Sequence, residues 1–213
     1  MVRLLLGTAL LLSGCTPLVV MHGARPVPVK NVDLTGAVVM ENRASDLANG
    51  YIPRPVAGLR VGLGADTDMG MRVYPLGAGV DFKYRFFESG RTHIAVTPGV
   101  DVAYYTEANV VSMDVRLPWT VEFVLGHNFS LIGDARIILR DNWVAMDPAP
   151  HSGGLNRLEV FWGSGGRVEW NPKRFRMGMS GQLFVRPAER RKFALSLAAD
   201  IGVRIGKRTS KEK

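Results

Sequence analysis

Apolar and polar residues alternate along most of the chain, most clearly from Pro55 to Phe87. Nearly every second residue of this stretch is apolar, and glycines and charged residues stand between them. A period of two is typical of a β-strand with one apolar and one polar face. The alternation is interrupted at Asp66-Thr67-Asp68 and at Pro75-Leu76-Gly77, which contain residues that favour turns. The stretch therefore predicts three antiparallel strands that follow one another directly.

The same alternation continues on both sides of this stretch and predicts ten strands in all. The other strands are expected at Val32–Met40, Thr92–Tyr104, Ser112–Leu125, Phe129–Arg140, Leu155–Trp170, Phe175–Val185 and Phe193–Ile205. The apolar positions of these strands carry no charge, while the opposite positions carry nearly all of the charged residues. This dyad pattern is typical of a membrane β-barrel. Strands of about ten residues, tilted by about 40°, rise about 25 Å, which matches the apolar band of an outer membrane.

We therefore expect an all-β fold, an up-and-down antiparallel barrel of outer-membrane type with about ten strands, or eight as the fallback. Residues 32–205 resemble small bacterial outer-membrane β-barrel proteins. The two longest links, 41–54 and 141–154, are expected on the outside, because such barrels have short periplasmic turns and longer outer loops. The alternative is a soluble lipocalin-like barrel in which the same apolar face points inward. Alternation in the sequence does not distinguish these two orientations.

The first fifteen residues have the features of an export signal. A short basic start is followed by an apolar run, Leu4–Leu12, that is too short to span a membrane as a helix. The run ends in Leu12-Ser13-Gly14-Cys15, which resembles the lipobox of bacterial lipoproteins. The resemblance implies cleavage before Cys15 and a lipid, including palmitate, on Cys15. The alternative is an ordinary signal peptide with a chance cysteine, but this single cysteine cannot form an internal disulfide.

These features divide the chain into four expected parts. They are a signal peptide (1–14), a lipidated N-terminus and tether (15–31), the β-barrel domain (32–205) and a basic disordered tail (206–213). The net charge of +8 does not indicate nucleic acid binding, because an exported lipoprotein rarely meets nucleic acid and no basic helix or RNA motif is present. Excess Arg and Lys instead fits a polar barrel lining or contact with anionic lipid head groups.

The charges on the polar face are expected to line the inside of the barrel. These positions are Arg60, Arg72, Asp81, Lys83, Arg85, Asp101, Asp114, Arg116, Glu122, Asp134, Arg136, Arg176, Asp200 and Arg204. One interpretation is an ion-paired core that satisfies buried charge. The other is a narrow water-filled pore whose positive excess favours anions. We favour the core, because numerous inward charges can fill a narrow barrel.

No arrangement of residues indicates a cofactor, a metal or a catalytic site. The four histidines do not stand at the spacing of metal ligands: His22, His93, His127 and His151. His151-Ser152, with Asp141 or Asp147, could belong to a hydrolase at the outer rim. Adjacent His and Ser are not an activated pair by spacing alone, however. We therefore expect no metal, no cofactor and no enzymatic activity.

The expected function is that of an outer-membrane, lipid-anchored barrel with a structural or interaction role in the cell envelope. Loops 41–54 and 141–154 would contact an envelope protein partner, because loops on a rigid scaffold usually carry recognition. One alternative is a small anion-leaning channel. The other is a soluble, periplasm-facing, lipocalin-like binding barrel on a lipid anchor.

Overall fold

The structure is a computed structural model that describes residues 22–42, 52–105, 110–144, 158–172, 174–185 and 193–206. The strands in this part of the chain are β1 (Val32–Asn42), β2 (Ile52–Gly62), β3 (Thr67–Tyr74), β4 (Gly77–Ser89), β5 (Thr92–Val96), β6 (Gly99–Tyr105), β7 (Val110–Val124), β8 (Phe129–Val144), β9 (Glu159–Trp170), β10 (Phe175–Val185) and β11 (Phe193–Ile205). Among these residues, no helix has the length and apolarity needed to cross a membrane.

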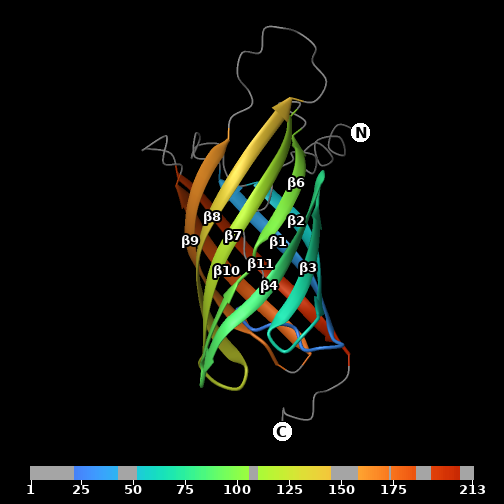
Figure 1. Ribbon diagram of the computed structural model, residues 1–213, viewed down its shortest axis with the longest axis vertical. Coiled ribbons are helices and arrows are strands. Elements are labelled where there is room, and N and C mark those ends of the chain that lie inside the picture. Colours follow the sequence, from blue (N-terminus) through green and yellow to red (C-terminus); the bar gives the residue numbers. More distant parts are fainter. Residues whose placement is uncertain are drawn as a thin grey trace.

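The described strands form a closed antiparallel barrel (Figure 1). Strands that follow one another in the chain lie side by side, and β1 closes the barrel by pairing along its whole length with β11. β5 and β6 share one place in the barrel, because both pair with β4 on one side and with β7 on the other. The barrel is therefore ten-stranded and up-and-down, as predicted, and the eight-stranded fallback is wrong.

The division between β5 and β6 falls at Thr97-Pro98, inside a stretch that the sequence predicts as one strand. Proline has no amide hydrogen and cannot donate to a neighbouring strand. The pairing nevertheless continues across the break, because Thr97 N donates to Pro118 O (3.0 Å) and Phe82 N donates to Pro98 O (2.9 Å). Inward and outward positions keep the same phase on both sides of the break.

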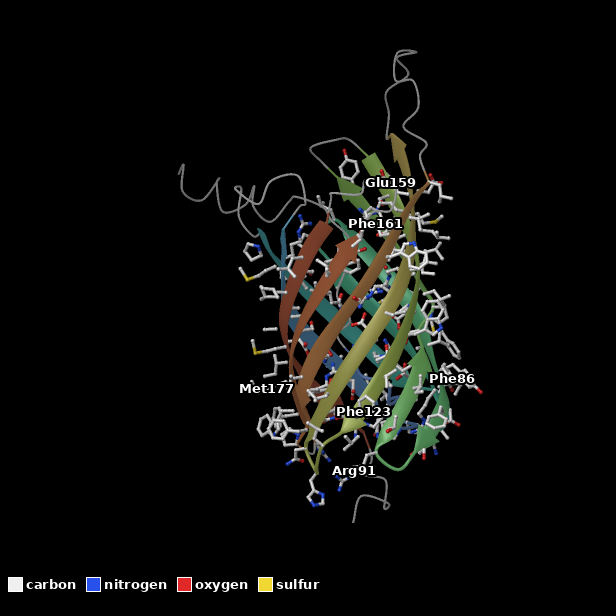
Figure 2. All side chains as sticks on the ribbon, turned by 90° about the vertical axis from the view of Figure 1, so that its left-hand side faces the viewer. Phe86, Arg91, Phe123, Glu159, Phe161 and Met177 are labelled. Atoms are coloured by element: carbon white, nitrogen blue, oxygen red, sulfur yellow. The ribbon has the colours of Figure 1, made fainter. Side chains whose placement is uncertain are left out.

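Apolar side chains cover the outside of the barrel, and charged side chains lie inside. Phe86, Phe123 and Met177, labelled in Figure 2, point away from the barrel and are 52%, 49% and 48% exposed. The charged residues of the strands include many that are almost completely buried, such as Asp68 and Asp114. A barrel with an apolar outer face is suited to lipid rather than to water. The soluble lipocalin-like alternative, with its apolar face inward, is therefore wrong.

The two ends of the barrel differ in their links. At the lower end in Figure 1, turns of at most four residues join β2 to β3, β4 to β5, β7 to β8 and β9 to β10. β1 begins and β11 ends at this same end, where Val32 pairs with Ile205. We call it the short-turn end and the opposite end the long-loop end. Outer-membrane barrels carry their short turns on the periplasmic side.

The predicted long links, 41–54 and 141–154, join β1 to β2 and β8 to β9 at the long-loop end, but residues 41–42, 52–54 and 141–144 belong to those strands. Residues 43–51 and 145–157 lie outside the described ranges. Two links at the long-loop end are short: the one from β3 to β4, as the sequence indicates, and the one from β6 to β7 over residues 106–109. β3 and β4 are joined by Pro75 and Leu76, and Leu76 adopts a left-handed backbone conformation with φ of 60°.

Residues His22–Asn31 lie inside the barrel, toward the short-turn end, and we call them the luminal segment. Ala24 and Val27 are buried there. Val29 forms a parallel bridge with Gly62 of β2, and Gly62 N donates to Asn31 O at 3.1 Å. The sequence predicts a tether over these residues and does not indicate that they enter the barrel. Residues 1–21, including the predicted signal peptide and Cys15, lie outside the described part of the chain.

Candidate functional site in the barrel lumen

The structure places the predicted lining residues on the inner side of the barrel. Those that are buried are Arg60, Arg72, Lys83, Asp101, Asp114, Arg116, Glu122, Asp134, Arg136, Arg176 and Asp200. Asp81, Arg85 and Arg204 are partly exposed. These charges come from eight strands, and their arrangement differs between the two halves of the lumen.

In the long-loop half, ion pairs join the strands of the wall directly to one another. Arg72 of β3 donates through Nε to Asp101 Oδ1 of β6 at 2.7 Å. Arg116 of β7 contacts the other oxygen of the same carboxylate. Arg140 of β8 donates through Nε and Nη2 to both oxygens of Asp114, each at 2.7 Å. Bidentate pairs of this kind are geometrically specific and strong.

Nearer the long-loop end, apolar side chains lie inside the barrel together with the buried Arg54 of β2. One buried cluster consists of Ala37, Val39, Val56, Tyr74, Ala103 and Ala198. Ile138 and Phe184 are also buried inward-facing residues, and the guanidinium of Arg136 lies over the Phe184 ring, 5.5 Å from its centroid. Small and aromatic side chains therefore occupy much of the lumen at this level, beside the buried Arg54.

In the short-turn half, the wall also contains ion pairs. Arg60 of β2 pairs with Asp68 of β3 and with Asp81 of β4, the latter at 2.6 Å. Arg204 of β11 donates to both carboxylate oxygens of Asp33 on β1, at 2.8 and 3.1 Å. Here, however, several polar groups of the wall make contacts with the luminal segment as well.

Three charged residues of the wall hold residues 23–27 of the luminal segment, and a fourth, Arg176, contacts His22. Glu122 of β7 accepts hydrogen bonds from Arg25 N at 3.0 Å and from Arg25 Nε at 2.7 Å. Asp68 accepts from Val27 N at 2.8 Å, and Lys83 Nζ donates to Gly23 O at 2.6 Å. Two of these three wall residues bind backbone atoms of the segment alone. The segment thus adds hydrogen bonds to buried wall charges, of which Asp68 is also bound by Arg60.

Gly23 occupies a place where a side chain does not fit. A Cβ atom there would lie 2.4 Å from Glu122 Oε2 and 3.2 Å from Ile132 Cδ1. Glu122 cannot easily move aside, because its carboxylate is buried and is held by Arg25. The glycine therefore allows the segment to approach the wall closely enough for its other contacts.

A cavity of about 390 Å³ lies between the luminal segment and the wall at the short-turn end. Its lining includes five cationic residues, Arg25, Lys83, Arg85, Arg176 and Arg204, and three acidic ones, Asp33, Glu122 and Glu169. A second cavity, of about 30 Å³, lies beside His22 deeper in the lumen. The larger cavity lies at the short-turn end, between residues of the luminal segment and residues of the wall.

Sequence reasoning missed several residues of this half, namely His22, Arg25, Asp33, Asp68, Arg167 and Glu169. Arg167 pairs with Glu169 and Asp200, and all three are buried. The glycines at 163, 165 and 166 interrupt the alternation of β9 and obscure the inward phase of Arg167 and Glu169. Asp68 stands in a stretch that the sequence predicts as a turn.

The histidines do not come together. His22 is half-buried, His93 is buried in different surroundings, and His127 is exposed. His151, Ser152 and Asp147 of the considered hydrolase lie outside the described ranges. Within those ranges no group of three or more His, Cys, Asp or Glu is placed to hold a metal ion.

No family model matches the sequence, and no curated protein does. Among solved structures, the chain resembles an outer membrane channel from Pseudomonas putida F1, with 9% identity over 88% of this chain and 100% of that chain, at a TM-score of 0.54. This likeness shows the fold. The chain has the fold of an outer-membrane β-barrel.

Two further solved structures are similar at lower TM-scores. The N-terminal β-barrel domain of Pseudomonas aeruginosa OprF has 9% identity over 84% of this chain and 100% of that chain, at a TM-score of 0.39. The outer membrane enzyme PagL has 11% identity over 80% of this chain and 98% of that chain, at a TM-score of 0.41. Neither likeness bears on the activity of this barrel.

Proposed function

We propose that this protein is an outer-membrane lipoprotein with a structural or interaction role in the envelope. In this proposal, side chains and the luminal segment block the lumen of its barrel. The observation that supports this most is the luminal segment bound to Glu122, Asp68 and Lys83. Ion pairs and apolar side chains occupy much of the lumen beyond the segment. Conduction needs a continuous hydrated path, and buried, paired charges do not provide one.

Recording from planar bilayers tests the closed state. The purified full chain should insert, migrate as a folded heat-modifiable band, and produce no stable unitary current steps. Steady unitary steps from folded wild-type protein would contradict the closed barrel. A folded outer-membrane porin inserted into the same bilayer controls for the sensitivity of the recording.

A small anion-leaning channel is the second candidate, supported by the cationic lining of the short-turn cavity. In this case the luminal segment would leave the lumen to open the barrel. Currents from wild-type protein that lose anion selectivity in Lys83→Glu would favour the channel. A selectivity that does not respond to Lys83→Glu would place the conducting path elsewhere.

The lipid anchor is proposed from the Leu12-Ser13-Gly14-Cys15 motif. The expected mature chain begins at Cys15 and carries acyl groups. The intact mass of protein extracted from membranes tests this directly. A mass equal to that of residues 1–213, or a thiol at Cys15 that reacts with maleimide, would overturn the anchor while leaving the barrel unaffected.

The proposed contacts with an envelope protein are loops 41–54 and 141–154, because loops on a rigid barrel usually carry recognition. A pull-down from detergent-solubilised envelope tests this role with residues 43–51 or 145–157 replaced by a short Gly/Ser link, because residues 41–42, 52–54 and 141–144 belong to β1, β2 and β8. A partner retained by both replacements would exclude these loops. The proposal includes no catalysis, and hydrolysis of an ester or lipid substrate that is lost in His151→Ala would contradict it.

A further inference from the structure

Arg176 of β10 is a buried cation in the cavity at the short-turn end. Its side chain is 8% exposed, and it lines the cavity together with His22 and Arg25 of the luminal segment. Nη1 donates to His22 Nδ1, and Nη2 donates to Thr35 Oγ1. Both partners are neutral acceptors, because a histidine nitrogen that accepts a hydrogen bond carries no proton.

The guanidinium has hydrogen-bonding capacity that these contacts do not use. An arginine side chain carries five N–H donors, and the two contacts use two of them. Nε of Arg176 is buried without a hydrogen-bond partner. Buried charges are normally paired and fully hydrogen-bonded, because an unpaired one is costly to desolvate.

The carboxylates around Arg176 are already occupied by other arginines. In the described structure, the one carboxylate within 4.0 Å of its guanidinium is that of Asp33, at 4.0 Å, and Asp33 is bound by two nitrogens of Arg204. Glu169 and Asp200 are also nearby. Both of them accept hydrogen bonds from Arg167, including one to each at 3.0 Å.

The neighbouring Arg167 of β9 is an arginine whose charge is compensated by carboxylates of the wall. It contacts two carboxylates, whereas Arg176 has no carboxylate in hydrogen-bonding contact within the described residues. The cavity next to Arg176 has a volume of about 390 Å³ and a lining with two more cationic than acidic residues. The site therefore combines an incompletely paired cation, unused donors and an accessible space.

We propose that this cavity binds a small oxyanion, a carboxylate or a phosphate, through the guanidinium of Arg176. Arginine binds such groups well, because its planar donors match two oxygens of a carboxylate or phosphate. The anion enters from the short-turn end and lies between the luminal segment and β10. It supplies the negative charge that the wall does not provide to Arg176.

The probe for this site is inorganic phosphate, added to the folded full chain in a phosphate-free, non-ionic detergent at constant ionic strength. A ligand that binds only the folded state raises the unfolding temperature in a saturable way. In Arg176→Gln the affinity for phosphate should fall by about tenfold or more, because a charge-assisted contact is lost. Arg176→Lys keeps the charge but not the paired donors, so its affinity should be intermediate.

The matched control is Arg72→Gln, which removes another buried lumen arginine that does not line this cavity. Its unfolding temperature without phosphate should fall, but the rise caused by phosphate should remain. Equal rises in wild type and in folded Arg176→Gln would overturn the proposal. So would a rise that does not saturate, or one that is lost equally in Arg72→Gln.

A phospholipid head group carries the same chemistry as free phosphate, and nanodiscs separate the two sources. Stabilisation by phosphatidylglycerol over phosphatidylcholine that is lost in Arg176→Gln would identify the head group as the ligand. Stabilisation by free phosphate in detergent alone would identify a soluble anion. Absence of both effects would overturn the site and would leave the closed-barrel proposal untouched.

Discussion

Buried charged side chains have different partners in the two halves of the lumen. In the long-loop half, the carboxylates Asp101 and Asp114 are bound by arginines of other wall strands, and an apolar cluster lies beyond them. In the short-turn half, Glu122, Asp68 and Lys83 bind the luminal segment as well. The buried wall charges therefore bind one another in the long-loop half, whereas several of those in the short-turn half also bind the luminal segment.

This difference shows that the luminal segment is part of the core of the barrel rather than a passive link to it. Removing a charge in the long-loop half should affect the barrel wall directly. Removing a contact in the short-turn half should first weaken the binding of the luminal segment to the wall. The predictions below follow from this contrast, and they are ordered from the largest expected loss of stability to the smallest.

The largest effect is expected for Asp101→Asn in the long-loop half. Asp101 is buried and serves both Arg72 and Arg116, so its loss leaves two buried cations with less compensation. Breaking a buried ion pair costs about 3–5 kcal/mol. Urea unfolding of the protein in lipid vesicles, followed by tryptophan fluorescence, measures the change in the free energy of unfolding.

The control for this prediction is Asp66→Asn at the short-turn rim. Asp66 also pairs with an arginine, Arg85, at 2.6 Å, but its side chain is 51% exposed. An exposed pair contributes about 0–1 kcal/mol. If Asp101→Asn lowered the free energy of unfolding no more than Asp66→Asn does, the inner charges would be hydrated, which would contradict the closed core.

Gly23→Ala should have an intermediate effect, confined to the short-turn half. The added methyl group would meet Glu122 and Ile132, and relief of that overlap breaks the contacts of Glu122 with Arg25. Overpacking of this kind costs about 1–3 kcal/mol. Gly36→Ala is the matched control, since a Cβ at Gly36 meets nothing within 4 Å.

The same substitution can be followed at the segment itself. A cysteine at the buried position Val27 should react slowly with a water-soluble maleimide in the folded barrel. Addition of Gly23→Ala should accelerate this labelling, while addition of Gly36→Ala should not. Equal labelling rates in the two double variants would show that the segment is not held through Glu122.

Alternation in the sequence was sufficient to predict the strands, their faces and the number of strands. It succeeded where an apolar outer face alternates with charged inward positions, and it did not reveal the inward phase of Arg167 and Glu169 in β9. It could not predict which charges pair with each other. Arg116 and Asp101 lie on adjacent strands, for example, whereas Arg60 and Asp81 belong to β2 and β4 and meet across β3.

The position of the luminal segment inside the barrel could not be predicted from the sequence, for a physical reason. Its residues lack strand periodicity, and Pro26 and Pro28 are equally compatible with a tether. The segment is held mainly through backbone atoms and Arg25, and backbone contacts leave no signature in the residue types. Glu122 and Lys83 were predicted to face inward, but their partners became evident only from the closed barrel.

The smallest effect is expected for Arg176→Gln, in contrast to Arg167→Gln on the neighbouring strand. Arg167→Gln removes the partner of two buried carboxylates, Glu169 and Asp200, and should cost about 3–5 kcal/mol. Arg176→Gln removes hydrogen bonds to neutral groups, worth about 1 kcal/mol each, and also removes a buried cation that lacks its own carboxylate. Because these two contributions oppose each other, the free energy of unfolding in phosphate-free detergent should change by about 1 kcal/mol or less. Urea unfolding of both variants under the same conditions measures the difference. A loss for Arg176→Gln as large as that for Arg167→Gln would show that the wall already compensates Arg176, which would remove the charge argument for an anion at this site.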